Sequence, residues 1–415
     1  MKKFLATMLM LILPATANAM TLNEAVRIAL ENNPSLQRTG RAIDLAEESL
    51  KVAKASKGLS VDLSGSASAA KSEGSSTSES LSTRLRGALT LYSGKKLENQ
   101  IQSAELEIDV AKLDFLQAQD DLIYQVATAY INALENLATT QVDLKTEENL
   151  AEHEKNIAAL YDAGSKARID LLRAQVETSN AQQDTAKSHA AYEVSLANLA
   201  TLLSIDTRTN LTVEPVQTSL ELGDVENFMV MAAENRADLR ADSLKIDQGE
   251  LDIEMARAGN RPTISAEVGA GLGGQSSRWD FRYDLSGGVS ASWNIFDGGI
   301  TKSEILQAEI ALERLYLDVQ NNINSVNEEV VTAYKNLRIA LMRLRTTERA
   351  VQLAEEERYI ATEKYRAGEG ILLDILDAEV SLATARKNHV SATYDVARYR
   401  IDLAHAVGDT TLAFE

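Results

Sequence analysis

Residues 95–160 contain no proline or glycine and are rich in Ala, Leu, Glu, Gln and Lys. This composition predicts one uninterrupted helix, which at 1.5 Å per residue would be about 100 Å long. A globular core cannot bury a helix of that length, so it needs packing partners along its whole length. The chain has only four prolines, which favours long helices over a loop-rich fold.

A second long helix follows because the chain is duplicated. Tyr161-Asp162-Ala163-Gly164 recurs as Tyr365-Arg366-Ala367-Gly368, at an offset of 204 positions. Asp170 and Leu172 align with Asp374 and Leu376 at the same offset. A period of this length is too long for a solenoid repeat and indicates two tandem copies of half a molecule.

Each copy is expected to contain a helix, two strands, a very long helix and a shorter helix. Copy one spans residues 20–210 and copy two residues 222–408, with a linker at 211–221 and a short tail at 409–415. The expected elements of the two copies are helices at 22–57, 95–160 and 169–203 with strands at about 60–70 and 81–91, then helices at 225–258, 299–364 and 371–407 with strands at about 262–273 and 281–295. Thr21 and Glu24 predict a capping box at the first helix, and Gly164 a left-handed residue in the turn after 95–160. In each copy the summed length of the two shorter helices is close to the length of the long helix. Stacked end to end, they could pack along it as an antiparallel companion.

The N-terminus has the pattern of a secretory signal. Lys2 and Lys3 precede an apolar run from Phe4 to Leu13, and Ala17-Asn18-Ala19 forms a small-residue cleavage site. The run is too short to span a membrane, so residues 1–19 are predicted to be a signal peptide. No later stretch reaches 18 uncharged apolar residues.

The predicted strands alternate between apolar and small polar residues. Val61 and Leu63 alternate with Asp62 and Ser64, and the other three strands follow the same period of two. Strands of about ten residues with one apolar and one polar face fit a transmembrane β-barrel, although a half-buried sheet would show the same pattern. Four strands cannot close a barrel, so several chains would have to share it, and this arithmetic does not choose among dimer, trimer and tetramer.

Composition excludes several classes of function. The chain has no cysteine, which removes disulfides, thiolate nucleophiles and cysteine metal sites. A net charge of −19 argues against a general nucleic-acid binder. The four histidines are scattered without a metal-binding spacing, and Asp120-Asp121 and Glu355-Glu356-Glu357 are most simply solvated helix faces. We therefore expect no enzyme, no cofactor and no resident metal.

The signal peptide, the duplication, Thr21-Leu22-Asn23-Glu24-Ala25 and the Tyr365-x-x-Gly368 turn before Leu373-Asp374-Ile375-Leu376-Asp377-Ala378 resemble the TolC-like outer-membrane efflux channels. The resemblance covers essentially the whole mature chain, although no single motif carries it. It implies an α+β membrane protein: a homotrimer whose shared outer-membrane β-barrel, four strands per chain, continues as a long α-helical coiled-coil barrel across the periplasm of a Gram-negative-type cell. Such channels work with a periplasmic adaptor and an inner-membrane transporter to export drugs, other small molecules or secreted proteins.

The resemblance also implies where a gate would lie. Asp374 and Asp377 match the acidic positions of the closed aperture, and their spacing places both on one helix face. In a trimer they would form two carboxylate rings that attract cations, whereas copy one has Asp170 and Arg173 at these positions. The plain alternative is a pair of solvated surface acids.

Residues near these acids are implied as a latch for the closed state. Tyr365 and Asp170 match the pattern, but the position of the family's arginine is Gly370 here, and Arg366 lies four residues away. The turns at Gly164 and Gly368 would be docking points for the adaptor.

A second interpretation, in which the protein is structural and not a channel, stays open at this point. A secreted coiled-coil stalk or surface adhesin without a pore would also need long helices, with its hairpins packed on one another. Such a stalk should show sustained heptads, whereas hairpins interrupt the helices here.

Overall fold

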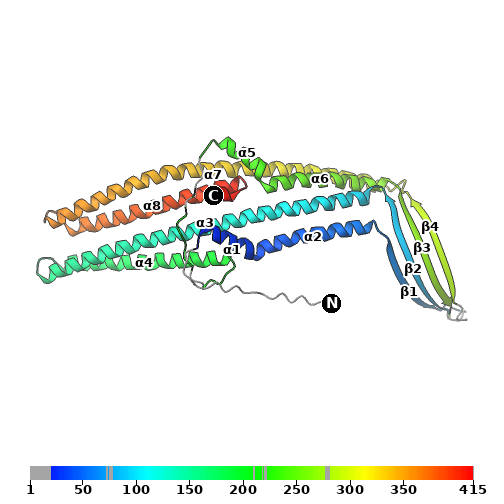
Figure 1. Ribbon diagram of the computed structural model, residues 1–415, viewed down its shortest axis with the longest axis horizontal. Coiled ribbons are helices and arrows are strands. Elements are labelled where there is room, and N and C mark those ends of the chain that lie inside the picture. Colours follow the sequence, from blue (N-terminus) through cyan, green and yellow to red (C-terminus); the bar gives the residue numbers. More distant parts are fainter. Residues whose placement is uncertain are drawn as a thin grey trace. The chain divides into compact units, whose positions relative to one another are not determined.

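The computed structural model describes residues 20–71, 73, 78–208, 211–216, 218, 222–275 and 281–414. Its elements, drawn in Figure 1, are α1 (Leu22–Asn32), α2 (Pro34–Ser56), β1 (Ser60–Ala70), β2 (Ser78–Ser93), α3 (Lys96–Asp162), α4 (Arg168–Leu202), α5 (Val225–Asn235), α6 (Ala237–Arg257), η1 (Ala258–Asn260), β3 (Thr263–Gln275), β4 (Arg282–Ser292), α7 (Ile300–Arg366), α8 (Leu372–Ala406) and η2 (Thr410–Ala413). The predicted duplication of helix, hairpin, long helix and shorter helix is confirmed. The signal peptide at 1–19 and parts of the linker and of both hairpin loops lie outside the described residues.

The first helix of each copy is broken, which the sequence analysis missed. Asn33 and Arg236 both leave the helical conformation, with ψ of 120° and 122°. Pro34 explains the first break, because the residue before a proline is driven out of the α region. In copy two Arg236 is followed by Ala237 and not by a proline, so the helix can break at this place without a proline. The predicted capping box is present, since the Thr21 and Glu24 side chains each accept the other's backbone N–H.

The chain forms two compact units, and neither corresponds to a single sequence copy. Unit 1 comprises Met1–Pro34, Gln119–Asn235 and Glu328–Glu415, and unit 2 comprises Ser35–Ala118 and Arg236–Asn327. Both helix breaks fall at the boundaries between these ranges. Each unit therefore takes corresponding segments from both copies.

Unit 2 contains a four-stranded antiparallel sheet in the order β1-β2-β3-β4. Every residue of β1 and β4 is exposed, so neither edge strand has a face packed in this chain. β2 is longer than expected. β4 is shorter than expected, because β3 begins at Thr263, opposite Ser292, and leaves no partner for later residues of β4. Trp293 instead donates its indole N–H to the Asn260 carbonyl at 3.0 Å.

The sheet keeps its alternation across all four strands. Residues opposite one another in an antiparallel pair point to the same face. The register therefore gathers Val61, Leu63, Leu85, Val268 and Leu285 with other apolar residues on one face. The serines of β1 and all charged residues of the strands except Glu79 lie on the other face.

Helices of unit 2 pack as the predicted antiparallel companions. Lys54 of α2 pairs with Glu105 of α3 at 3.1 Å, and Arg257 of α6 with Glu309 of α7 at 3.6 Å. α6 and α7 approach closely at Gly249, where a Cβ would lie 2.9 Å from Leu312. An apolar cluster in this unit packs Leu113 of α3 with Ala237 and Ala241 of α6.

Unit 1 has the larger core. Its fully buried side chains come from α3, α4, α7 and α8 and include Val126, Tyr130, Ile131, Leu199, Leu203, Leu337, Ile401 and Leu403. Tyr130 also ties the start of the chain to the linker, because its hydroxyl donates to the Met20 carbonyl at 2.7 Å and accepts from the Glu214 N–H at 2.9 Å. Burial raises the pKa of Tyr130 to about 12. None of the described helices is long and apolar enough to cross a membrane.

Candidate functional site

The two helix-turn ends of unit 1 are built alike. Gly164 between α3 and α4 has φ of +75°, and Gly368 between α7 and α8 has φ of +76°. Each glycine N–H bonds back three residues and the next N–H bonds back five, which caps the long helix with a Schellman motif. A side chain in this left-handed conformation would be strained, so glycine is required by the turn itself. The predicted left-handed conformation of Gly164 is confirmed.

Asp374 and Asp377 lie at the start of α8 and line one open groove between α7 and α8. Glu356, Glu357 and Lys364 of α7 line the same groove. Asp374 also accepts the Ile371 N–H at 3.2 Å, which caps its own helix. The two acids therefore share a face that is rich in carboxylates and can concentrate cations.

The expected latch residues are only partly brought together. The Tyr365 ring packs against Ile375 and Ala378, and its hydroxyl is buried without a hydrogen-bond partner among the described residues. Arg366 pairs with Glu363 of its own helix at 2.8 Å, and no bond joins Tyr365 to Asp170 in the described part of the chain.

A cation from the turn of copy one lies over the Tyr365 ring. The ammonium of Lys166 lies 4.3 Å from the ring centroid, a cation–π contact. Lys166 is the copy-one counterpart of Gly370, where a Cβ would come within 3.1 Å of the Tyr365 nitrogen. A side chain at position 370 would thus be crowded by the turn, and Lys166 places a positive charge against Tyr365 from the other copy.

A buried acid close to this turn was missed by the sequence analysis. Glu379 of α8 is only 2% exposed and contacts Arg358 of α7 at 3.3 Å and His153 of α3 at 3.8 Å. Burial would raise the pKa of Glu379, but the bonds and charges of His153, Arg358 and Asn149 outweigh it and the net pKa is lowered. The available signal was that Glu379 falls on the same helical stripe as Ile375 and Leu382, which are buried.

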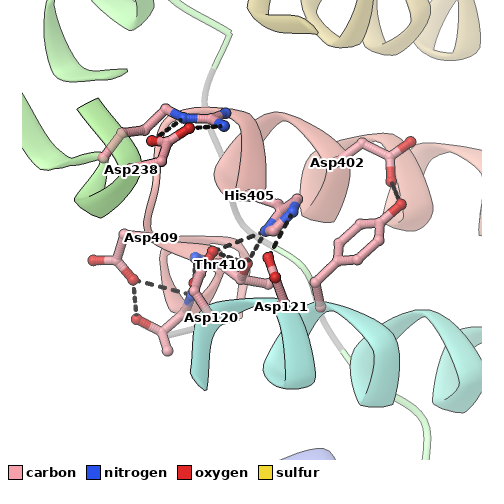
Figure 2. A network of polar contacts seen from close by, with 10 residues as sticks. Asp120, Asp121, Asp238, Asp402, His405, Asp409 and Thr410 are labelled. Carbon is pink, nitrogen blue, oxygen red and sulfur yellow. Dashed lines mark hydrogen bonds and ion pairs between the residues drawn. The ribbon is translucent and has the colours of Figure 1, made fainter. Parts of the chain in front are cut away.

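A second polar network, shown in Figure 2, joins α3 to the end of the chain. Asp120 accepts from the Thr410 N–H at 2.7 Å and contacts the His405 ring at 2.8 Å. Tyr124 stacks on His405 at 4.4 Å and donates to Asp402 at 3.1 Å. Burial raises the pKa of both Asp402 and Tyr124. The expectation of a solvated face is wrong for Asp120, and Thr410 of the predicted tail at 409–415 is bonded to α3.

These networks hold helices together. No group of three or more His, Asp or Glu side chains within the described ranges is arranged to hold a metal ion. His405 is occupied by carboxylates and an aromatic ring, and His153 by Glu379.

Comparison with known proteins identifies the family. The family model for outer membrane efflux proteins matches residues 25–204 and again 229–409. Nodulation protein T of Rhizobium leguminosarum bv. trifolii is 24% identical over 422 residues, covering 93% of this chain and 85% of the relative. Outer membrane protein TolC of Vibrio cholerae is also 24% identical, covering 94% and 91%.

Solved structures show the same fold. CusC superposes with a TM-score of 0.82 at 19% identity, covering 94% of this chain and 92% of that one. VceC, an outer membrane protein of Vibrio cholerae, gives 0.80 at 18% identity, covering 95% and 97%. The TolC-like resemblance, the outer-membrane location and the non-enzymatic transport class are confirmed at the level of the family. The chain belongs to the outer membrane efflux protein family.

Proposed function

We propose that three copies of this chain form one continuous channel through the outer membrane and the periplasm, open to cargo supplied by an inner-membrane transporter. The observation that carries this proposal is the sheet of unit 2. Among the described strands β1 pairs only with β2 and β4 only with β3, and the sheet has one apolar and one polar face.

Such a sheet is incomplete in a single chain. Backbone groups at an open edge cannot be left unpaired in lipid, so β1 and β4 need further strands. Only multiples of four strands are available from identical copies, and at least about eight are needed for closure. The family resemblance supports three copies and hence a shared barrel of twelve strands.

The helices offer matching evidence. Large apolar side chains stay exposed on α2, α4 and α7, including Leu45, Val52, Leu172, Val176, Ile339 and Met342. Helices with exposed apolar stripes pack against further helices when these are supplied. Neighbouring copies would cover these stripes and continue the helical wall.

The gate would lie at the helix-turn ends. Three copies would place Asp374 and Asp377 in two acidic rings, and the turns at Gly164 and Gly368 would receive a periplasmic adaptor. Within each chain the latch would consist of Tyr365 with Lys166 beside it, and Asp170 and Arg366 would engage the neighbouring copy when the aperture closes. The cargo would be small molecules or secreted protein.

The stalk or adhesin is the weaker candidate. It requires hairpins that pack face to face, whereas the two hairpins here pair edge to edge through β2 and β3. An exposed apolar sheet face would also aggregate in water.

Single-channel recording of the mature protein in a planar bilayer tests the proposal. The parent should give long-lived channels of small, cation-preferring conductance. The Asp374→Ala/Asp377→Ala variant should show a larger conductance with weaker cation preference. The matched control is Asp44→Ala/Glu47→Ala, which removes two exposed acids with the same spacing from α2 and should behave as the parent.

Two results would contradict the proposal at different levels. Channels that respond equally to both double variants would remove the gate assignment and keep the channel. Well-folded protein that gives no channel at all would overturn the function itself.

A further inference from the structure

We infer that the polar face of the sheet carries a charge-balanced selectivity band, which lets small solutes of either charge sign pass the β-barrel. The band consists of Asp62, Arg84, Arg86, Glu267, Arg282 and Asp284. This inference rests on the proposed channel, in which the polar face lines the lumen. Nothing in the acidic groove of α7 and α8 is needed for it.

The six charges share one face and one zone of the sheet. Asp62 lies opposite Arg86, and Arg84 and Asp284 both lie opposite Gly271. The only other charged residue of the described strands, Glu79, alternates onto the apolar face, opposite Ala69. Beyond the band, towards the hairpin loops, the polar face continues with Ser68 and Ser80, whose hydroxyls bond at 2.8 Å.

Glycines in β3 make room for the band. Arg86 pairs with Glu267 on the neighbouring strand, but Arg84 and Asp284 approach to 3.7 Å across the whole width of β3. A Cβ at Gly271 would overlap the Asp284 carboxylate, and a Cβ at Gly269 would lie 2.8 Å from the Ser286 hydroxyl. Because glycine has no side chain, Gly269 and Gly271 leave a shallow trough along β3, over which charged side chains of β2 and β4 meet.

Stability does not account for this arrangement. The Arg84 and Asp284 side chains are 62% and 58% exposed, and ion pairs so exposed contribute little to folding. Both groups stay open to water and can exchange partners with a passing charged solute. Charges that line a pore act on permeating ions over about one Debye length, which is comparable to the radius of such a barrel.

The balance of sign sets the expected selectivity. The band contains three acidic and three basic side chains, so its net charge is zero in each chain. A neutral band favours neither cations nor anions, in contrast to the wholly acidic pair Asp374 and Asp377. Sorting by charge would therefore occur at the periplasmic end, and the barrel would admit anionic, cationic and zwitterionic small molecules alike.

Zero-current potentials of single channels under a potassium chloride gradient test the band. Arg84→Gln/Arg86→Gln should raise the ratio of potassium to chloride permeability at least threefold, because it leaves the three acids unbalanced. Asp62→Asn/Glu267→Gln should lower the same ratio at least threefold. Parent and variants are compared with Asp374→Ala/Asp377→Ala in every chain, so that the acidic pair does not set the measured ratio.

Two variants control for folding and location. Arg84→Lys/Arg86→Lys keeps the charge and should retain the parent's ratio. Glu79→Gln removes a charge from the same strand on the other face and should leave the ratio unchanged. If the two charge-removing variants conduct but change the ratio by less than twofold, or if Glu79→Gln changes it as much as they do, the band is overturned. If the parent itself forms no channel, the proposed function fails and the band fails with it.

Discussion

Helices α4 and α8 are counterparts in the two sequence copies, yet their surroundings in the chain differ greatly. Both have 35 residues, but 14 residues of α8 are buried against six of α4. Leu376 of α8 is 5% exposed, whereas its counterpart Leu172 of α4 is 45% exposed. α8 contacts both α7 and α3, as the bonds of Arg386 to Glu355 and of Lys387 to Asp143 show.

This difference shows where the chain is incomplete. The duplication aligns the two helices, and apolar residues such as Leu172 and Val176 stay exposed on α4 although the counterpart helix α8 has more buried residues. A stripe that is covered in one copy and bare in the other is best explained by a cover supplied from outside the chain. The proposed trimer would provide it.

The largest expected effect compares the two leucines directly. Leu376→Ala should lower the free energy of unfolding by about 2–5 kcal/mol, because it opens a cavity beside Leu150 and Ile157. Leu172→Ala should cost under about 1 kcal/mol in the separated chain, since the side chain is already half exposed. Chemical denaturation followed by circular dichroism measures both.

The same two variants test whether the exposed stripe of α4 is a subunit contact. In the assembled protein Leu172→Ala should lower the temperature at which oligomers dissociate on unheated SDS gels. If Leu172→Ala has no effect on the assembly while Leu376→Ala destabilises it, the bare stripe of α4 is not a subunit contact.

The next comparison concerns Glu379, whose copy-one counterpart is Gln175. Glu379→Gln should destabilise the protein by about 1–3 kcal/mol, because Arg358 loses its buried partner but is itself partly exposed. The folded-state pKa of Glu379 is lowered, so its contribution is present above its ordinary value of 4.5 and is lost as the pH falls through the folded value.

Unfolding free energies measured between about pH 3 and pH 7 check this sign. The difference between the parent and Glu379→Gln should shrink as the solution becomes acidic. Glu357→Gln, which alters an exposed acid on α7, is the control and should show no such convergence. A difference that stays constant down to pH 3 would show that the ionised carboxylate is not what stabilises this site.

The smallest expected effect compares two tyrosines. Tyr130 is fully buried and bonded to backbone groups of Met20 and Glu214, whereas its counterpart Tyr334 packs by its ring near Phe228 at 6.2 Å. Tyr130→Phe should cost about 1–2 kcal/mol because it removes the hydrogen bonds that this buried side chain makes to the backbone. Tyr334→Phe should change the free energy of unfolding by less than about 0.5 kcal/mol. Equal costs would mean that the hydroxyl of Tyr130 contributes nothing specific.

Local patterns predicted much of the fold. The absence of proline and glycine predicted α3 and α7, alternation predicted the four strands, and the repeated Tyr-x-x-Gly predicted both turns. The break at Arg236 could not be predicted, because no residue there disfavours a helix and the break falls between two packing units. Strand ends also depended on pairing, as β4 stops at Ser292 where β3 begins.

The candidate site was harder to predict than the fold. The spacing of Asp374 and Asp377 placed them on one face, and the structure puts both in one groove. The contacts of Asp120 with His405 and of Glu379 with His153 were missed because each joins helices more than two hundred residues apart in sequence. Lys166 was missed because a lysine in a turn gives no sign of the ring that it contacts.

In the proposed channel, the sheet and the bare helix stripe both require three copies of the chain. Native mass spectrometry of the mature protein released from detergent micelles measures the number of copies directly. A trimer would give a single dominant species with three times the mass of the mature chain. A dominant monomer, or an assembly of two or four chains, would contradict the proposed trimer.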